Sequence, residues 1–307
     1  MAVIALMMTI SASAQFYIYF SDGTVAKVDS ISMVAPADAE DPTIPDNPST
    51  PSQGIGTFSV SATKQVTFSS GNLQYTQSTN TWSFASAQYE VLGTGNVIGG
   101  TVTSDEYGYD KSGTALADKV DLFGWSTSTT NFGVSTSTSY TDYSGSFVDW
   151  GTNQIGSDAP NTWRTLTYDE WNYLRNGRPN ASSLRGVAQV NGVNGLIFLP
   201  DNWTCPEGVT FKSGFHSSYY GVDYYAAYQT FTAEQWVKLE AAGAIFLPAA
   251  GIRYGSDVGN VQGSGYYWSA TEGNSDRADY LYFYSVGAGL DGYGRHYGLS
   301  VRLVKDL

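Results

Sequence analysis

The fold is decided by residues 263–307, which read GSGYYWSATEGNSDRADYLYFYSVGAGLDGYGRHYGLSVRLVKDL. Both ends of this stretch have the composition of a structural framework, beginning with the Tyr-Trp pair at 267–268. In the closing run, residues 299–304, apolar residues alternate with Ser300 and Arg302. A period of two is the pattern of a β-strand with one buried face, so we expect a half-buried strand here.

The middle of the stretch, residues 272–298, is dominated by Tyr, Gly, Asp and Ser. Antibody paratopes share this composition, because Tyr supplies rigid contact area while Ser and Gly adapt their hydrogen bonds. Within it, Leu281 and Phe283 would face a core, and three alternating tyrosines would stand about 7 Å apart on the opposite, exposed face. These are Tyr280, Tyr282 and Tyr284. They indicate either a binding surface or a sheet that uses Tyr for packing alone, since Tyr favours strands.

The composition of the 307-residue chain suits a secreted, β-rich protein. Only 14% of the residues are charged, against about 25% in typical soluble domains, so Ser, Thr, Asn and Gly supply most of the polarity. The formal net charge is −13 and no basic cluster occurs, which argues against nucleic acids and anionic membranes as partners. The single cysteine, Cys205, excludes an intrachain disulfide and a cysteine-based zinc site.

The first residues predict export. Residues 1–14 read MAVIALMMTISASA, an apolar run followed by the small-x-small pattern at 12–14 that precedes signal-peptide cleavage. The run is shorter than the roughly 20 apolar residues of a spanning helix, so we expect no membrane span. No Lys or Arg precedes Lys27, so the usual positive segment is missing, and no Cys follows the cleavage site to carry a lipid anchor. We therefore expect a secreted or cell-surface protein.

Three segments follow the predicted signal peptide. Residues 15–35 carry Asp22-Gly23 between two β-rich runs, which predicts a short hairpin. Residues 36–56 are rich in Pro and acidic residues without an apolar period, which indicates a solvated linker. Residues 57–307 form the main part of the chain, with a length suited to one large domain or two small ones.

The main domain opens with short alternating runs separated by Ser, Gly and Asn, which predict antiparallel strands. The runs are 58–60, 66–68, 73–75 and 82–84. Residues 93–162 are rich in Gly, Ser and Thr with scattered aromatic residues. We expect this region to form long loops that are packed by their own aromatic side chains.

Two helices are predicted by their first turns. Residues 167–174 begin with Thr and carry Glu three residues later, which is a capping box. Residues 232–239 repeat the box with Thr and Gln, and Gly243 ends this helix. Each helix carries a Trp-Leu pair on one face and leads to a similar apolar strand, 195–200 or 243–248. These features predict an α+β fold in which both helices pack on a common, mostly antiparallel sheet.

No catalytic constellation stands out. The two histidines, His216 and His296, have no partners at metal-ligand spacing, and no Gly-x-Ser-x-Gly motif occurs. A glycosidase needs two carboxylates about 5–10 Å apart, but Asp169 and Glu170 are explained as acids in the first turn of a helix. We therefore expect neither an enzyme nor a cofactor. Four acidic residues could ligate Ca²⁺, although without EF-hand spacing: Asp105, Glu106, Asp110 and Asp118.

Seven strings of the main domain resemble a family of secreted, paralogous surface proteins from Gram-negative gut anaerobes. They are FSVSATKQVTFSSGNLQY (58–75), DLFGWST (121–127), WRTLTYDEWNYL (163–174), NGLIFLPDNW (194–203), WVKLEAAGAIFLPAAGIR (236–253), GYYWSAT (265–271) and GLSVRLV (298–304). The resemblance covers most of residues 57–307 and keeps the order of the strings. It implies a C-type-lectin-like fold, similar in its core to the formylglycine-generating enzymes.

The C-terminal stretch also resembles the variable region of proteins diversified by retroelements. The matching features are Tyr-Trp-Ser-x-Thr, a segment rich in Tyr, Ser, Asp and Gly, and a closing Gly-x-Ser-Val-Arg-Leu-Val. In those proteins an error-prone reverse transcriptase rewrites adenines in Asn-rich codons, and residues 293–298 (YGRHYG) look like such a product. The resemblance implies a variable segment over about 266–299 whose variable side chains contribute little to the core.

Two departures limit what the resemblance implies. Formylglycine-generating enzymes use a pair of active-site cysteines, whereas this chain has only Cys205, so we do not expect that activity. Sugar-binding C-type lectins hold Ca²⁺ through Glu-Pro-Asn and Trp-Asn-Asp motifs, and this chain contains neither. Residues 201–203 (DNW) carry similar residues in another order, so calcium-dependent sugar binding is not implied.

Together these features predict an exported, non-enzymatic, monomeric protein that binds a protein or glycan on another cell through its C-terminal face. The expected ligand-binding residues are Asn274, Ser275, Asp276, Asp279, Tyr280, Tyr282, Tyr284, Asp291, Tyr293, His296 and Tyr297. The tyrosines would provide contact area, and the polar residues would provide selectivity. Two alternatives stay open: a fixed carbohydrate-binding adhesin of the same fold, and a polysaccharide hydrolase whose carboxylates the sequence does not pair.

Overall fold

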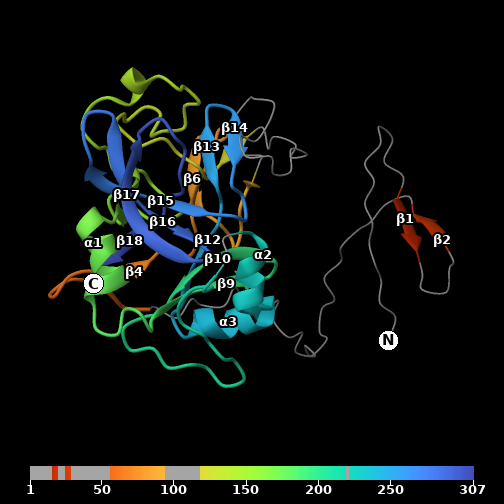
Figure 1. Ribbon diagram of the computed structural model, residues 1–307. Helices are drawn as coiled ribbons and strands as arrows, with labels where there is room; N and C mark the ends of the chain where they lie inside the picture. The colour runs from red at the N-terminus through yellow and green to blue at the C-terminus, as the bar shows by residue number, and fades with distance from the viewer. Residues whose placement is uncertain (1–15, 20–24, 29–55, 94–117, 219–220) are drawn as a thin grey trace. The chain divides into compact units, whose positions relative to one another are not determined.

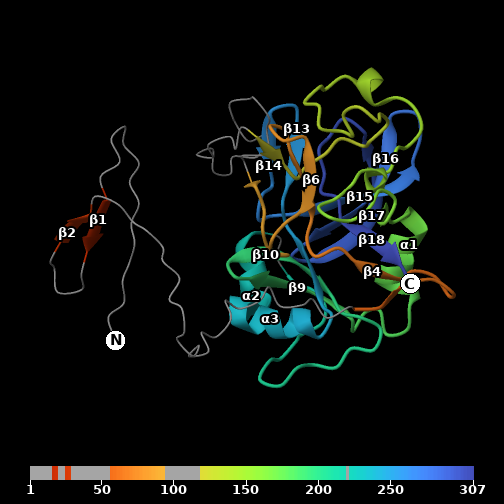
Figure 2. The same ribbon diagram turned by 180° about the vertical axis from the view of Figure 1, so that it is seen from behind.

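The computed structural model describes residues 16–19, 25–28, 56–93, 118–218 and 221–307 (Figures 1 and 2). The chain divides into two compact units, residues 1–49 and 50–307. In the first unit, β1 (Phe16–Tyr19) pairs antiparallel with β2 (Val25–Val28). The predicted signal peptide, the turn at Asp22-Gly23 and nearly all of the predicted linker lie outside the described residues.

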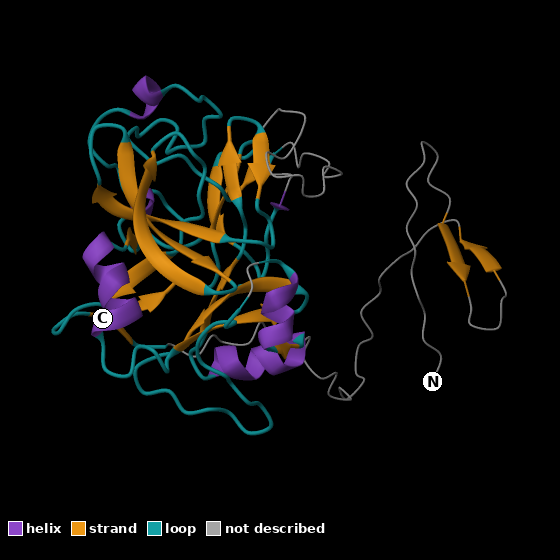
Figure 3. Ribbon diagram, in the orientation of Figure 1, coloured by secondary structure: helices purple, strands orange, loops and turns teal. Residues whose placement is uncertain are grey.

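The second unit is mixed α+β, with many strands and few helices (Figure 3), so the predicted α+β class is confirmed. Its strands are β3 (Phe58–Ser59), β4 (Gln65–Phe68), β5 (Leu73–Thr76), β6 (Thr81–Phe84), β7 (Lys119–Val120), β8 (Arg164–Thr165), β9 (Arg185–Val190), β10 (Val193–Phe198), β11 (Thr230–Phe231), β12 (Ile245–Pro248), β13 (Ile252–Tyr254), β14 (Asp257–Gly259), β15 (Gly265–Glu272), β16 (Arg277–Tyr284), β17 (Gly287–Gly294) and β18 (Leu303–Asp306). The predicted early strands correspond to β3 to β6, and the two apolar strands correspond to β10 and β12.

These strands form several small sheets rather than one large one. The sheet orders are β3–β4–β18–β8, β6–β5–β7, β11–β9–β10–β12, β13–β14 and β15–β16–β17. Among the described strands only the β11–β9 pair is parallel, which agrees with the predicted antiparallel character.

The first predicted helix is present with its capping box. Helix α1 (Tyr168–Asn172) begins after Thr167, whose hydroxyl accepts the backbone N–H of Glu170. The Glu170 carboxylate accepts the Thr167 N–H in return. A π-helical turn, Tyr173–Gly177, continues α1. The box satisfies two backbone groups that the start of a helix otherwise leaves unpaired, which explains why the sequence signal is reliable here.

The second predicted helix, α3 (Ala233–Ala241), begins after Thr232 with the same reciprocal bonds to Gln235. The sequence pattern does not predict the short helix α2 (Asp223–Tyr228), which lacks a capping side chain. Two 3-10 turns complete the described helical segments, Tyr140–Tyr143 and Trp150–Thr152.

The Trp residues of the two predicted helices belong to clusters on opposite faces of the β11–β9–β10–β12 sheet. Trp171 of α1 shares a buried cluster with Leu196 and Leu247. Trp236 of α3 shares another with Ile197 and Phe246. Because successive residues of a strand point to opposite faces, β10 and β12 contribute to both clusters. Helix α1 nevertheless packs on β15, β16 and β17, whereas α3 packs on the β11–β9–β10–β12 sheet, so the expectation of one common sheet for both helices is wrong.

The closing run, residues 299–304, is buried on both sides, so the expected half-buried strand is wrong. Ser300 is 0% and Arg302 is 1% exposed, like their apolar neighbours. The run bridges Phe123 on one side and Tyr267 on the other, and it leads into β18, which lies between β4 and β8. On the polar face, Arg302 donates to the carbonyl of Phe246 at 3.4 Å and to the side-chain oxygen of Gln88, so other segments cover this face as well.

Residues 118–162 form long loops with little regular structure, as predicted, and lie beside the β15–β16–β17 sheet in both views (Figures 1 and 2). Aromatic side chains of the loops fill their own interior, since Phe123, Trp125 and Trp150 are each 0% exposed. The indole N–H of Trp125 donates to the carbonyl of Ser269 in β15 at 2.9 Å. The loops are thus attached directly to this sheet.

The hypothesis of a calcium site finds no support in the described part of the chain. Asp105, Glu106 and Asp110 lie outside the described residues, and Asp118 accepts hydrogen bonds from the backbone and hydroxyl of Ser78. The residues that the structure describes contain no group of three His, Cys, Asp or Glu side chains placed to hold a metal. None of their helices combines the length and the apolar character that crossing a bilayer requires.

Candidate ligand-binding surface

The β15–β16–β17 sheet carries most of the predicted binding residues, and its two faces differ. On one face Leu281 and Phe283 pack into the buried cluster that also holds Tyr267. On the other face three tyrosines of β16 belong to a second cluster: Tyr280, Tyr282 and Tyr284. The alternation predicted for this strand is therefore confirmed.

The tyrosine face is less exposed than predicted. Tyr280 is only 6% exposed, because its ring packs against Tyr266 and Trp268 of β15 at centroid distances of 6.0 and 6.3 Å. Tyr282 and Tyr284 are half-buried. The expectation of an exposed side chain is wrong for Tyr280, and it holds only in part for the other two.

Ring contacts join seven tyrosines into one continuous set, which we call the tyrosine row: Tyr254, Tyr266, Tyr280, Tyr282, Tyr284, Tyr293 and Tyr297. Along β16 the ring centroids lie 5.4 to 5.9 Å apart. The set continues through Tyr293 and Tyr297 to Tyr254 over centroid distances of 4.4 to 5.7 Å. Most of these contacts are tilted or edge-on, the arrangements that aromatic pairs prefer, so each ring is held by its neighbours.

Glycines on β17 leave one flank of the tyrosine row open. β17 is an edge strand, and each of its residues keeps some exposure. It places Gly287 opposite Tyr284 and Gly289 opposite Tyr282. A Cβ on Gly289 would lie 2.4 Å from the end of the Tyr282 ring, far inside van der Waals contact. Glycine therefore allows this ring to lie over the edge strand, where a ligand can reach it.

His296 is buried, whereas the sequence predicted an exposed polar contact. It is 2% exposed, and its ring lies 4.4 Å from Tyr140, 5.6 Å from Tyr254 and 4.5 Å from Tyr297. Its Nδ1 atom has no hydrogen-bond partner among the described residues. Burial lowers the pKa of the imidazole, and the charge of Asp276 opposes this shift only in part. His296 thus links the tyrosine row to Tyr140 instead of offering a polar group.

Arg295 lies in the segment predicted to vary, but it is a structural anchor that is 1% exposed. Its guanidinium donates to the Glu272 carboxylate at 2.6 Å, to the carbonyl of Asn274 and to a loop carbonyl at 3.0 Å. It also lies 4.4 Å from the ring of Trp125. The side chains of the variable segment were expected to contribute little to the core. This expectation is wrong for Arg295, Tyr280 and His296, which are all buried.

The remaining predicted polar residues lie in three places. Three are exposed in the turn between β15 and β16: Asn274, Ser275 and Asp276. Asp291 is exposed on β17, directly opposite Tyr280. Asp279 points to the other face, since it precedes Tyr280 in the strand; burial raises the pKa of its carboxyl group, and the charge of Asp291 adds to this. The structure therefore does not bring Asp279 together with the tyrosine row.

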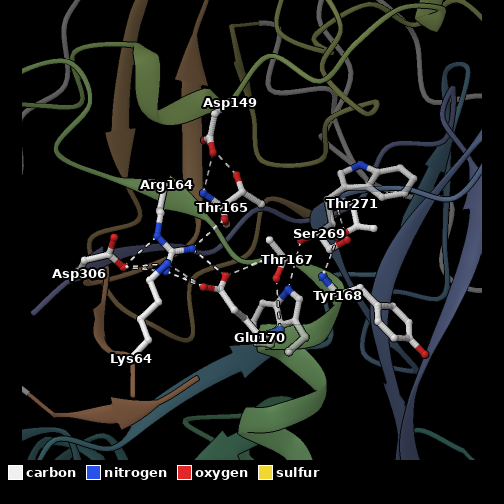
Figure 4. Close-up of polar contacts among 12 residues, drawn as sticks. Lys64, Asp149, Arg164, Thr165, Thr167, Tyr168, Glu170, Ser269, Thr271 and Asp306 are labelled. Carbon is white, nitrogen blue, oxygen red and sulfur yellow. Dashed lines mark hydrogen bonds and ion pairs between the residues drawn. The ribbon is translucent and has the colours of Figure 1, made fainter. Parts of the chain in front are cut away.

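An ion-pair cluster fixes the framework of the domain (Figure 4). Arg164 donates to both carboxylate oxygens of Glu170 at 2.7 and 2.9 Å, and to Asp306 of β18 at 2.7 Å. Lys64 adds a bond to Glu170 at 3.1 Å. Burial alone would raise the pKa of Glu170, but the hydrogen bonds from Arg164, the Thr167 backbone and Lys64 outweigh it and lower the pKa.

The same cluster is connected to the sheet of the candidate surface. The N–H of Tyr168 donates to the Thr271 hydroxyl of β15 at 2.9 Å (Figure 4). The Asp149 carboxylate accepts both the N–H and the hydroxyl of Thr165 at 3.0 Å. Glu170 therefore serves the framework, in agreement with its interpretation as a first-turn acid.

Sequence reasoning missed three aromatic residues of this surface: Tyr140, Tyr254 and Tyr266. Tyr266 alternates with Trp268, so the period-two pattern could have placed it on the tyrosine face. Tyr254 and Tyr140 are 41% and 55% exposed and come from segments distant in the sequence. No local pattern connects those two residues to the C-terminal stretch.

A family model described as a domain of unknown function (DUF8237) matches residues 225–304. No curated protein and no solved structure matches the chain. The matched residues include α3, the whole β15–β16–β17 sheet and every member of the tyrosine row. The tyrosine row is thus contained in the part of the chain that this family model matches, whereas Tyr140 lies outside it.

Proposed function

We propose that this protein is an exported, non-enzymatic binding protein with a C-type-lectin-like fold. Its tyrosine row and exposed polar residues of the β15–β16 turn and of β17 bind a protein or a glycan on another cell or a host surface. These polar residues are Asn274, Ser275, Asp276 and Asp291. In this proposal the protein acts as a monomer, needs no cofactor and binds neither nucleic acid nor membrane.

The observation that carries the proposal is the connected tyrosine row with its open flank. Rings held by their neighbours lose little freedom when a ligand binds, so their contact area is available at a small entropic cost. Tyrosine is also enriched among the residues that dominate binding energy at interfaces. The exposed end at Tyr254 and the glycine edge of β17 supply the access that a ligand needs.

We further propose that a retroelement diversifies the segment within limits set by packing. Positions that are exposed or only partly buried can change at little cost to the core: Asn274, Ser275, Asp276, Tyr282, Tyr284, Asp291, Tyr293 and Tyr297. Arg295 and Tyr280 are excluded by their burial. Gly294 is excluded by contact, since a Cβ there would lie 2.7 Å from the His296 ring. The variable segment expected over about 266–299 is therefore an interrupted set of positions.

Deep sequencing of the 3′ end of the gene across a population of the source strain tests this proposal. We expect substitutions concentrated at these exposed and partly buried positions within codons 272–299. The codons for 265–268, for Arg295 and for 300–304 should stay unchanged. A uniform 3′ end would contradict diversification and favour the fixed adhesin of the same fold. Frequent substitution of Arg295 would instead contradict the packing limits.

A further inference from the structure

A groove of about 340 Å³ lies between the β5–β6 hairpin and the loop at 129–134, and no member of the tyrosine row lines it. This volume is at the lower end of the range for small-molecule sites, about 300–1,000 Å³. Three aromatic side chains contribute to its lining: Tyr75, Trp82 and Phe132. The Trp82 ring lies 4.7 Å from that of Tyr75 and 5.7 Å from that of Phe132, so the three rings are in contact. Trp82 and Phe132 are 8% and 9% exposed, so Tyr75 is the most accessible ring of the three.

The polar part of the lining consists of uncharged amides and hydroxyls, including Gln77, Asn80 and Asn131. The Oδ1 atom of Asn80 accepts the Tyr75 hydroxyl at 3.0 Å, and the Oδ1 atom of Asn131 accepts the Gly133 N–H at 3.0 Å. These bonds orient both amides and leave their NH₂ groups as donors. None of the described residues that line the groove is charged.

Phe132, which lines the groove, has an unfavourable backbone conformation. Its φ of +46° is left-handed, which is unfavourable for a bulky side chain. The indole N–H of Trp150 donates to the Phe132 carbonyl at 2.8 Å, and the Phe132 N–H donates to the Ser128 carbonyl at 3.1 Å. Such strain persists only where the surroundings enforce it, and it concentrates at functional sites.

We propose that this groove binds a neutral hexopyranose unit of a glycan. One face of a pyranose ring presents C–H groups that pack on aromatic rings, and its hydroxyls accept hydrogen bonds from amide NH₂ groups. A purely apolar ligand would leave the amides unpaired. An acidic sugar would bring a charge that nothing in the described lining compensates. A neutral sugar can pack on the aromatic part of the lining and accept hydrogen bonds from its amides.

The test uses the full chain and an array of neutral oligosaccharides of glucose, galactose, mannose and N-acetylhexosamines, with sialylated and sulfated glycans beside them. The Kd of each glycan that binds is then measured by calorimetry. The variant Gln77→Ala/Asn80→Gly removes two amides, and glycine tolerates the φ of +50° at position 80. We expect a neutral glycan to bind and this variant to weaken it by about tenfold. The matched control Asn176→Ala removes an exposed amide that belongs neither to the groove nor to the tyrosine row, and it should leave that Kd unchanged.

Three results would overturn the proposal. The first is that no neutral glycan binds at millimolar concentration, and the second is that charged glycans are preferred. The third is a Kd that responds to Tyr282→Ala and not to the groove variant, which would assign the glycan to the tyrosine row. Both groove positions are exposed, so thermal unfolding of the variant should match that of the parent chain. If it does not, the single variant Gln77→Ala replaces it, with an expected weakening of at least twofold.

Discussion

β17 and the closing run, residues 299–304, belong to one stretch of sequence but lie in opposite environments. Every residue of β17 keeps some exposure, whereas every residue of the closing run is buried. β17 forms the edge of its sheet, while the closing run leads into β18, which has a strand on each side. Position among the strands, more than residue alternation, therefore decides which residues can change without loss of the fold.

The largest expected difference in stability is between truncating a leucine of the closing run and truncating a leucine of β17. Leu303 is fully buried at the end of the closing run, so Leu303→Ala should lower the free energy of unfolding by about 2–5 kcal/mol through lost contacts and a cavity. Leu290 of β17 is only half-buried, and Leu290→Ala should cost less than half as much. Urea unfolding of both variants measures the difference. Equal losses would contradict the distinction between the two regions.

Arg295, between the two regions, should behave as framework. Arg295→Ala removes several charge-assisted hydrogen bonds and the contact with Trp125, and should lower the free energy of unfolding by about 2–4 kcal/mol. Arg295→Lys should recover only part of this, because an ammonium cannot reproduce the planar fork. The exposed Arg277 provides the control, since Arg277→Ala should change stability by no more than about 0.5 kcal/mol. Similar values for the two alanine variants would refute the anchoring role.

Glu170 should make the framework sensitive to acid. Its pKa in the folded state lies below the ordinary value of 4.5, so its contribution to stability is complete above that pH and is lost as the pH falls through the folded-state pKa. Glu170→Gln should cost about 1–3 kcal/mol at pH 7 and reduce the loss of stability below pH 4.5. The comparison is made by urea unfolding across the acid range, with Asp169→Asn as the control. If the stability of Glu170→Gln depended on pH as that of the parent chain does, the ion-pair cluster would not be the cause of the acid sensitivity.

The smallest effect on stability is expected on the open flank of the tyrosine row. The double variant Tyr282→Ala/Tyr293→Ala should stay cooperatively folded and lose less than about 2 kcal/mol, because both side chains are only partly buried. A ligand selected on the parent chain should bind it at least tenfold more weakly. Tyr280→Ala, on the same face but buried, should cost about 3–5 kcal/mol. Loss of the folded state in the double variant would count heavily against a surface role.

Local sequence patterns were sufficient to predict the helices, the strand faces and the loops of the main domain. Both capping boxes were predicted correctly, because each is a pair of hydrogen bonds between residues three apart. The separation of Leu281 and Phe283 from the tyrosines of β16 was also correct, because the pleat of a strand imposes it. The strong aromatic content of the 118–162 loops likewise indicated that they pack on themselves.

The exposure of individual side chains, by contrast, depends on segments that are distant in the sequence. The alternating run 299–304 could not reveal that both of its faces are covered, and Tyr280, Arg295 and His296 resemble their exposed neighbours in the sequence. Side chains of the neighbouring strand β15 bury Tyr280, and the 118–162 loops bury Arg295 and His296 at one end of the sheet. The tyrosine row exists for the same reason, since Tyr254 reaches it only through folding. Burial depends on what packs against a side chain, and a one-dimensional pattern contains that information only for near neighbours.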